Sequence, residues 1–349
     1  MNKLFYKIFA LGLVLMMGVT AWAGNPDRQG EAGAYELLMN PWARSAGLHT
    51  MTTSMITGVE ALRLNPAGLS RINQTEILVS NAIYLQGTGI NMNAAGFAQR
   101  VGNGAIGVSL MSLDFGDIPV TTTDQPEGTG TTFSPAFFHI GLSYSYTFEN
   151  KVSVGLTFRG ISESIQDLNA FGIAIDAGVQ YVTGPKDNFK FGISLRNVGS
   201  RMRFGGQGLA VQRPSPNDNG SELTFNQRAE DFEIPSVLNL GLSYDFLFGP
   251  THRLTVLGNF TANSFSQDQI GGGVEYSLKE IFMIRGGYKY EVGSEDPITA
   301  PIYEGLSAGA SVEIPLSKEN KNLRLGIDYA YRQTRVWNGT HNFSVRINI

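Results

Sequence analysis

Large hydrophobic residues alternate with small or polar ones along most of the chain from about residue 76. Between Val152 and Phe158, every second residue is a large hydrophobe, and Ser153, Gly155 and Thr157 stand between them. A period of two places the two sets on opposite faces of a β-strand. The pattern predicts about fourteen strands, an even number typical of bacterial membrane barrels. They cover 76–85, 90–99, 104–115, 139–148, 151–159, 171–181, 189–198, 238–248, 254–262, 269–277, 281–290, 306–314, 323–331 and 343–349, and the first three are among the weaker ones.

The connections between these strands alternate in length. Turns at one end are short, near 100–103, 149–150, 182–188, 249–251, 278–280 and 315–321. The other end includes long loops, near 86–89, 116–135, 162–170, 199–235, 265–268, 291–303 and 332–340. Outer-membrane barrels have short periplasmic turns and longer extracellular loops, whereas a soluble β-sandwich or propeller has no reason to sort loops this way. The sequence therefore predicts an all-β fold, an antiparallel transmembrane β-barrel.

The two faces of the expected strands differ in polarity. The apolar face, which includes Leu156, is expected to contact outer-membrane lipid, because a cation near the bilayer midplane costs about 2–4 kcal/mol. The other face, which includes Thr157, is expected to line a wet lumen that tolerates charge. Lumen charges of both signs are expected from Lys190, Arg196, Arg285, Lys289, Arg324, Arg346, Asp176, Asp245, Glu313 and Asp328. Aromatic residues at strand ends, such as Tyr146 and Phe148, are typical of girdles at the membrane boundaries.

The first residues indicate export. Two lysines precede a short apolar run, Ile8 to Val19, and Ala21-Trp22-Ala23 matches the small-x-small pattern of a signal-peptide cleavage site. The run is too short for a transmembrane helix, and an uncleaved membrane anchor is the alternative. We expect a cleaved signal peptide at 1–23, a hatch at 24–72 and a transmembrane barrel at 73–349, located in the cell outer membrane.

The segment before the first expected strand does not alternate. It contains two Asn-Pro steps, Asn40-Pro41-Trp42 and Asn65-Pro66, and such steps favour turns. We expect a short hatch inside the barrel, in which the Asn65 side chain bonds nearby backbone amides and Leu62, Leu64 and Leu69 pack against the inner wall. Its role is expected to be structural, with gating as the alternative. The residues expected to form it are Asn40, Pro41, Trp42, Arg44, Asn65, Pro66, Ala67, Gly68 and Leu69.

Composition and motifs argue against several other classes of function. The chain has no cysteine, and its four histidines lack a metal-binding spacing, so no metal site is expected. The net charge of −4 argues against nucleic-acid binding. Gly102 to Gly107 matches a dinucleotide-binding pattern, but a strand rather than a helix should follow. Gly305 to Gly309 matches the hydrolase elbow, which needs a strand-to-helix turn. We expect no enzyme activity and no cofactor, with an outer-membrane lipase as the enzymatic alternative.

Several motifs together resemble the PorV/PorQ family of Bacteroidota. They are Asn40-Pro41-Trp42-Ala43-Arg44-Ser45-Ala46-Gly47, Asn65-Pro66-Ala67-Gly68-Leu69, Leu195-Arg196-Asn197-Val198-Gly199, Met202 to Leu209 and Phe232 to Asn239. The resemblance covers essentially the whole mature chain. It implies a barrel similar to the FadL fatty-acid channels, with an N-terminal hatch. It also implies a place in type IX secretion, where PorV-like barrels bind exported cargo and pass it on for surface attachment.

Three classes of function therefore remain open. The first is a component of the type IX secretion and gliding apparatus that binds or shuttles exported proteins, with secretion components or cargo domains as partners. The second is a FadL-like passive channel that holds a hydrophobic ligand in its lumen, and a structural barrel without transport is a third. The long loop 199–235 is expected to carry a partner-binding surface. Its candidate residues are Met202, Arg203, Phe204 and Leu209, unless these only cap the barrel's own lumen.

Overall fold

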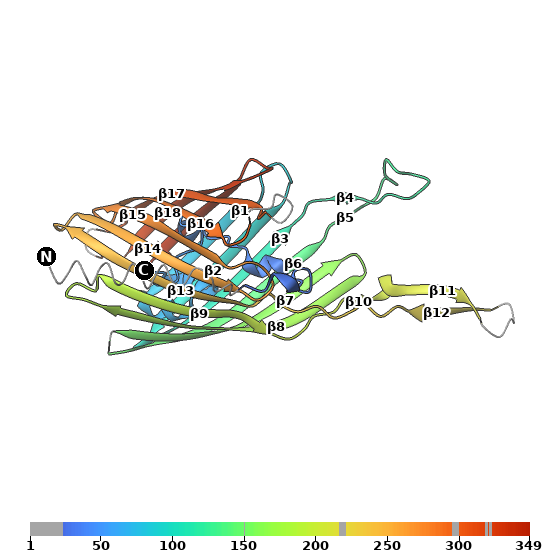
Figure 1. Cartoon of the computed structure of the whole chain (residues 1–349), viewed down its shortest axis with the longest axis horizontal. Coiled ribbons are helices and arrows are strands. Elements are labelled where there is room, and N and C mark those ends of the chain that lie inside the picture. The colour runs from blue at the N-terminus through green and yellow to red at the C-terminus, as the bar shows by residue number, and fades with distance from the viewer. Residues whose placement is uncertain (1–23, 150, 216–220, 295–299, 318–319, 321–322) are drawn as a thin grey trace.

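The computed structural model describes residues 24–149, 151–215, 221–294, 300–317, 320 and 323–349, and the expected signal peptide lies outside them. The chain forms a closed antiparallel barrel of fourteen strands, which confirms the predicted fold class (Figure 1). Consecutive barrel strands pair with each other, and β1 pairs with β19 to close the ring. The barrel strands are β1 (Thr75–Ile83), β2 (Asn91–Val101), β3 (Gly104–Asp114), β6 (Ala136–Phe148), β7 (Val152–Ile165), β8 (Leu168–Thr183), β9 (Phe189–Gly199), β13 (Val237–Phe248), β14 (His252–Asn263), β15 (Gln269–Leu278), β16 (Phe282–Glu291), β17 (Tyr303–Pro315), β18 (Arg324–Thr334) and β19 (Thr340–Asn348).

The connections sort by length as the sequence predicts. Short turns and residue Ile349 lie at one end of the barrel, here called the turn end, and the long connections lie at the other, the loop end (Figure 1). The predicted loop 162–170 is wrong, because β7 and β8 continue and only Gln166 and Asp167 form the turn. Ser162 and Ser164 stay in the ladder. Beyond the lipid boundary the outward face needs no hydrophobes, so the alternation fades although the strands continue.

Two extensions project beyond the loop end (Figure 1). One is the hairpin β4 (Ile118–Pro119) and β5 (Thr132–Phe133). The other starts with β10 (Gly205–Gly206), which pairs with β8, and the 3-10 turn η5 (Gln207–Leu209). It ends in a hairpin of β11 (Ala210–Pro214) and β12 (Glu222–Asn226), here called the arm. Among the described helices, none is long and apolar enough to cross a membrane.

The two faces of the barrel wall carry the side chains expected of them. Leu156 is 45% exposed on the outside, and Thr157 is fully buried on the inside. The outward ring pairs include Tyr146 with Phe148 and Tyr244 with Phe246, near the turn end. The lumen is not wet at Thr157, however, because its hydroxyl lies 3.4 Å from the Leu62 carbonyl of the hatch. A longer side chain at this position would therefore meet the hatch backbone and not water.

The segment before β1 lies inside the barrel, as predicted for the hatch. Its short helices are η1 (Pro26–Arg28), η2 (Tyr35–Leu38), α2 (Ala43–Ala46), η3 (Gly58–Glu60), α3 (Ala61–Leu64) and η4 (Pro66–Arg71). It starts at the loop end, where the Gly33 amide donates to the carbonyl of Glu233 at 3.0 Å. It reaches the turn end at Thr75, whose amide donates to the carbonyl of Ile349 at 3.2 Å. The hatch therefore passes lengthwise through the ring of strands.

The main apolar core lies between the hatch and the wall formed by β1, β2 and β3. Trp42, Leu62 and Leu69 are fully or almost fully buried there. They pack with the inward side chains Leu78, Ala82, Met92, Ala94, Ala98 and Ala105. Burying a large apolar side chain contributes about 1.5–3 kcal/mol. The inward face of these strands is thus also apolar, which explains why their alternation was weak in the sequence.

Candidate functional site

Inward polar side chains hold the hatch by bonding its backbone. A segment with little regular structure has many carbonyls that need donors. The wall supplies them: Gln180 donates to the Ile56 carbonyl at 2.9 Å, Ser145 to Ala67 at 3.0 Å, and Asn342 to Pro41 at 2.8 Å. The polar lumen face inferred from the sequence therefore serves mainly to seat the hatch.

The second Asn-Pro step sits on a pair of wall glycines. The Asn65 side chain accepts a hydrogen bond from the Ala67 amide at 3.2 Å, which confirms the predicted turn. It also donates to the Thr53 carbonyl at 2.9 Å. Gly155 and Gly178 pair with each other beneath this turn. A Cβ at Gly178 would collide with the side-chain oxygen of Asn65, so glycine is required for this close approach.

The other predicted hatch residues are also placed inside the barrel. The Asn40 side chain accepts from the Trp42 amide at 3.1 Å and donates to the Ser45 hydroxyl at 2.9 Å. Pro66, Ala67, Gly68 and Leu69 belong to η4 and are buried. Leu62 and Leu69 pack against the wall as predicted, whereas Leu64 packs with Ile56 and Ala61 of the hatch itself. Arg44 lies beside Glu275 of β15.

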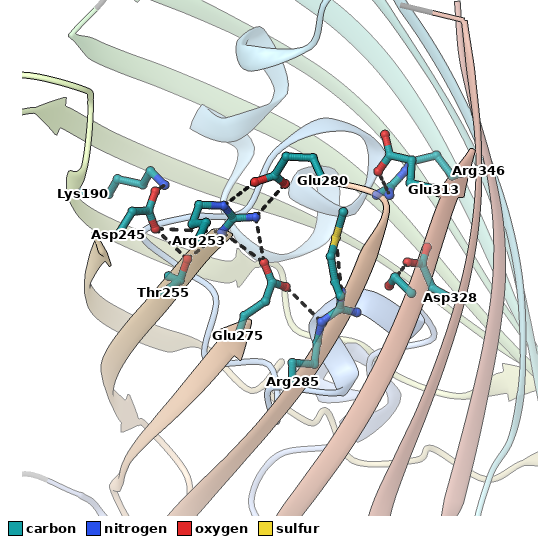
Figure 2. Close-up of polar contacts among 12 residues, drawn as sticks. Lys190, Asp245, Arg253, Thr255, Glu275, Glu280, Arg285, Glu313, Asp328 and Arg346 are labelled. Atoms are coloured by element: carbon teal, nitrogen blue, oxygen red, sulfur yellow. Dashed lines mark hydrogen bonds and ion pairs between the residues drawn. The ribbon is translucent and has the colours of Figure 1, made fainter. Parts of the chain in front are cut away.

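The turn-end half of the lumen is filled by matched charges (Figure 2). Arg253 bonds Glu275 at 3.3 Å and Glu280 at 2.8 Å, and Arg285 bonds Glu275 at 2.9 Å. The neighbouring pairs are Lys190 with Asp245, Arg324 with Glu313 and Arg346 with Glu313. Buried charges of opposite sign at these distances offset each other's desolvation. This half of the lumen is closed electrostatically as well as sterically.

The loop-end half contains a cavity of about 370 Å³ between the hatch and the wall of β9 and β13–β18. Such a volume is in the range of small-molecule sites. The apolar and aromatic lining consists of Tyr35, Leu38, Met39, Leu64, Tyr84, Val237, Ile302 and Tyr303. The polar lining consists of His49, Thr50, Thr53, Arg196, Asn239, Thr261, Asn263, Ser266, Gln269, Lys289 and Arg332. None of these lining residues is acidic.

Among the described residues, none of the three cations of the cavity forms an ion pair with an acid. Arg332 lies with its Cζ 4.6 Å from the centre of the Tyr303 ring, and its Nε has no hydrogen-bond partner. Among the described residues, Arg196 donates only to the Arg63 carbonyl, at 2.8 Å, and its Nε has no hydrogen-bond partner. Lys289 makes no hydrogen bond or ion pair with the described residues. Buried cationic donors without hydrogen-bond partners favour the binding of an anionic group in a cavity with apolar walls.

A latch at the barrel mouth joins the start of the hatch to the loop before β13. Glu233 accepts from Arg28 at 3.1 Å and from Arg201 at 2.9 Å. The hydrogen bonds from Arg28 and then Arg201 lower the pKa of Glu233. Arg28 also lies 4.2 Å above the ring of Phe265. The latch therefore fixes the N-terminal part of the hatch next to the cavity.

The residues proposed for partner binding lie close to the mouth and differ in exposure. Met202 is only 1% exposed and packs with Leu37 of the hatch and Ile161 of β7. Phe204 is half-buried, with its ring centre 5.8 Å from that of Phe232. Leu209 is half-buried in η5, and Arg203 is exposed and paired with Asp231 at 3.0 Å. Met202 and Phe204 thus help to cover the barrel's own mouth.

Sequence reasoning placed Arg196 and Lys289 in the lumen but missed Tyr35, His49, Tyr303 and Arg332. Arg332 has the same inward parity as Asp328 in β18, but the expected strand ended one residue too early. His49 lies in an irregular part of the hatch, so no periodic signal marks it. The two enzyme-like patterns lie in strands: Gly104 begins β3, and Ser307 of β17 points inward and donates to the Gly47 carbonyl at 3.2 Å.

Comparisons with known proteins bear on the fold. No family model matches the chain, and no curated protein matches it. The Pseudomonas putida toluene transporter TodX is similar, with a TM-score of 0.56 and 13% identity over 88% of this chain and 97% of its own. The monoaromatic hydrocarbon channel CymD has a TM-score of 0.56 and 14% identity over 88% and 96%. A Pseudomonas aeruginosa FadL homologue has a TM-score of 0.52 and 12% identity over 88% and 97%. The chain therefore has the FadL-like barrel fold of these transporters and channels.

Proposed function

We propose that the protein is a passive channel for small hydrophobic molecules, and that the loop-end cavity is its outer binding site. The observation that carries the proposal is the cavity itself, with apolar walls and three cations but no acid. The FadL-like fold supports it, because the similar structures include hydrocarbon channels. The chemistry of the lining favours an amphipathic ligand with an anionic head, since a neutral hydrocarbon would leave the cations unpaired.

Octanoate and octan-1-ol test the head-group preference, because they share a chain and differ in charge. We expect octanoate to bind the barrel in nanodiscs more tightly. Replacing Lys289 with Met should weaken octanoate about tenfold to a hundredfold, the cost of one charge-assisted hydrogen bond, and leave octanol almost unchanged. Lys186→Met, in an exposed turn at the other end, is the matched control. Toluene binding that is insensitive to Lys289 would instead support a channel for neutral hydrocarbons.

Passage through the barrel requires the hatch to move, because matched charges close the turn-end half. The hydroxyls of Ser54 in the hatch and Ser243 in β13 are 3.0 Å apart, and the chain has no cysteine of its own. A Ser54→Cys/Ser243→Cys variant places two sulfurs within reach of a disulfide. Oxidation should stop octanoate uptake into proteoliposomes while leaving its binding intact, and reduction should restore uptake. Unchanged uptake after complete oxidation contradicts a route through the hatch.

The arm supports a second candidate, a surface component of type IX secretion that binds exported proteins. Leu223 and Phe225 are 43% and 44% exposed, and Val211 pairs with Phe225 on the same face of the hairpin. An exposed apolar face on a two-stranded hairpin is typical of an interaction site. Leu223→Ser with Phe225→Ser should abolish cargo attachment if this candidate holds, whereas Thr224→Ser on the other face should not. Normal attachment in the double variant counts against it.

A further inference from the structure

The lipid-facing surface of β1, β2 and β3 carries a groove that the channel does not use. Its volume is about 950 Å³, and it lies on the outer side of the wall that holds the apolar core. Ala95 forms part of its floor, with Val79 and Leu110 as cross-strand neighbours. Phe138 lies on one flank and Phe343 and Tyr329 on the other. Small residues among large ones thus make a recess in this part of the barrel surface.

A row of polar residues crosses this groove. Asn81 pairs with Asn93, and Asn93 pairs with Ser112, so the three lie side by side on adjacent strands. The row continues into Phe343 on one side and Phe138 on the other. Aromatic rings at that level are typical of the boundary between hydrocarbon and headgroups. The polar row therefore lies where the linkages between lipid headgroups and acyl chains are found.

The hydrogen bond between the side chains of Asn81 and Asn93 satisfies only some of their donors and acceptors. The Asn81 amide donates to the Asn93 side-chain oxygen at 2.9 Å. This leaves the amide of Asn93 and the carbonyl oxygen of Asn81 without a partner among the described residues. A polar group at the edge of the hydrocarbon that lacks a hydrogen-bond partner is unfavourable. An occupant that supplies an acceptor to Asn93 would remove most of that cost.

We propose that this groove is a binding site for one membrane lipid, with an acyl chain over Ala95 and a linkage carbonyl hydrogen-bonded to the Asn93 amide. The groove is continuous with the lipid-facing surface, so lipid is the molecule already in contact with it. A narrow, flexible chain fits a recess between Phe138 and Phe343, whereas the convex face of a second barrel would bridge it. The Asn pair selects lipids with ester or amide carbonyls, which accept hydrogen bonds.

Native mass spectrometry of the barrel after detergent exchange tests this site. The probes are a diester phosphatidylethanolamine and its diether analogue, which lacks the carbonyls. We expect the wild-type barrel to retain the diester lipid and to lose most of the diether lipid. Ala95→Phe fills the groove and should abolish retention of both. Ala177→Phe is the matched control, because Ala177 is another half-buried outward alanine, between Leu156 and Leu195 of neighbouring strands.

The variant Asn81→Leu/Asn93→Leu separates hydrogen bonding from shape. It should keep the apolar groove but bind diester and diether lipids equally. Equal retention in wild type and Ala95→Phe overturns the proposal, as does an equal loss in Ala177→Phe. A dimer that dissociates in Ala95→Phe would identify a second copy as the occupant and overturn it too. Heat-modifiable migration in gel electrophoresis reports that each variant is folded, and it does not depend on the ligand of the cavity.

Discussion

The two halves of the lumen differ in whether their buried cations form ion pairs. In the turn-end half, Glu275 lies between Arg253 and Arg285, and each cation has an acid. In the loop-end half, Lys289 and Arg332 line a cavity without any acid. The same barrel therefore contains a half that is closed by its own ion pairs and a cavity whose cations form no ion pair within the described part of the chain. Under the proposed function, the turn-end half closes the barrel and the loop-end cavity binds the ligand.

The largest effect is expected from breaking the matched half. Glu275→Gln leaves Arg285 buried without its acid, and it should lower the free energy of unfolding by about 3–5 kcal/mol. Urea unfolding in lipid vesicles measures this. The control is Glu280→Gln, because Glu280 bonds the same Arg253 but its side chain is 49% exposed. Its loss should cost about 0–1 kcal/mol. Equal losses in the two variants would contradict a closed, charge-matched half.

A smaller effect of opposite sign is expected in the unmatched half. Lys289→Met removes a buried cation that forms no ion pair with the described residues, so it should raise the free energy of unfolding by about 1 kcal/mol. The same variant should lose octanoate affinity. Arg285→Met in the matched half should instead lower stability. If Lys289→Met lowers the free energy of unfolding as Arg285→Met does, the buried charges of the two halves contribute to stability in the same way.

The smallest effect concerns the latch at the mouth. Hydrogen bonds from Arg28 and Arg201 lower the pKa of Glu233. The latch is therefore fully formed above the ordinary pKa of a glutamate, and it is lost as the pH falls through the lowered value. Hydrogen exchange of the Gly33 amide, which donates to the Glu233 carbonyl, should quicken in that acidic range beyond the intrinsic change. In the Glu233→Gln variant, hydrogen exchange of the Gly33 amide should show only the intrinsic change with pH.

The barrel could be predicted from sequence because lipid contact imposes a pattern on each strand separately. Leu156 and Thr157 were assigned to the correct faces from their immediate neighbours alone. The alternation was among the weaker ones in β1 to β3, where Trp42 of the hatch packs against the inward face, and it ended early at Tyr331, which hid Arg332. Both deviations arise where a strand has a neighbour other than lipid or water.

The site could not be predicted because its contacts join distant parts of the chain. Ser54 meets Ser243, and Asn65 sits on Gly155 and Gly178. No local period marks such pairs, and an inward Thr157 gives no sign that a hatch carbonyl excludes water from it. The chemistry of the Asn-Pro turn was predictable, because it depends on residues two positions apart. The contact of this turn with the wall glycines was not predictable.

The pairing of β1 with β19 dictates an order of assembly. The hatch enters the ring at one end and leaves it at the other, encircled by strands that come later in the chain. After closure, it could reach its place only by being drawn lengthwise past Arg253 and Glu275. Closing the ring last, around a segment already in position, avoids that passage, although joining strands so far apart in sequence is slow. A factor that keeps β1 and β19 separate during insertion would therefore promote correct threading.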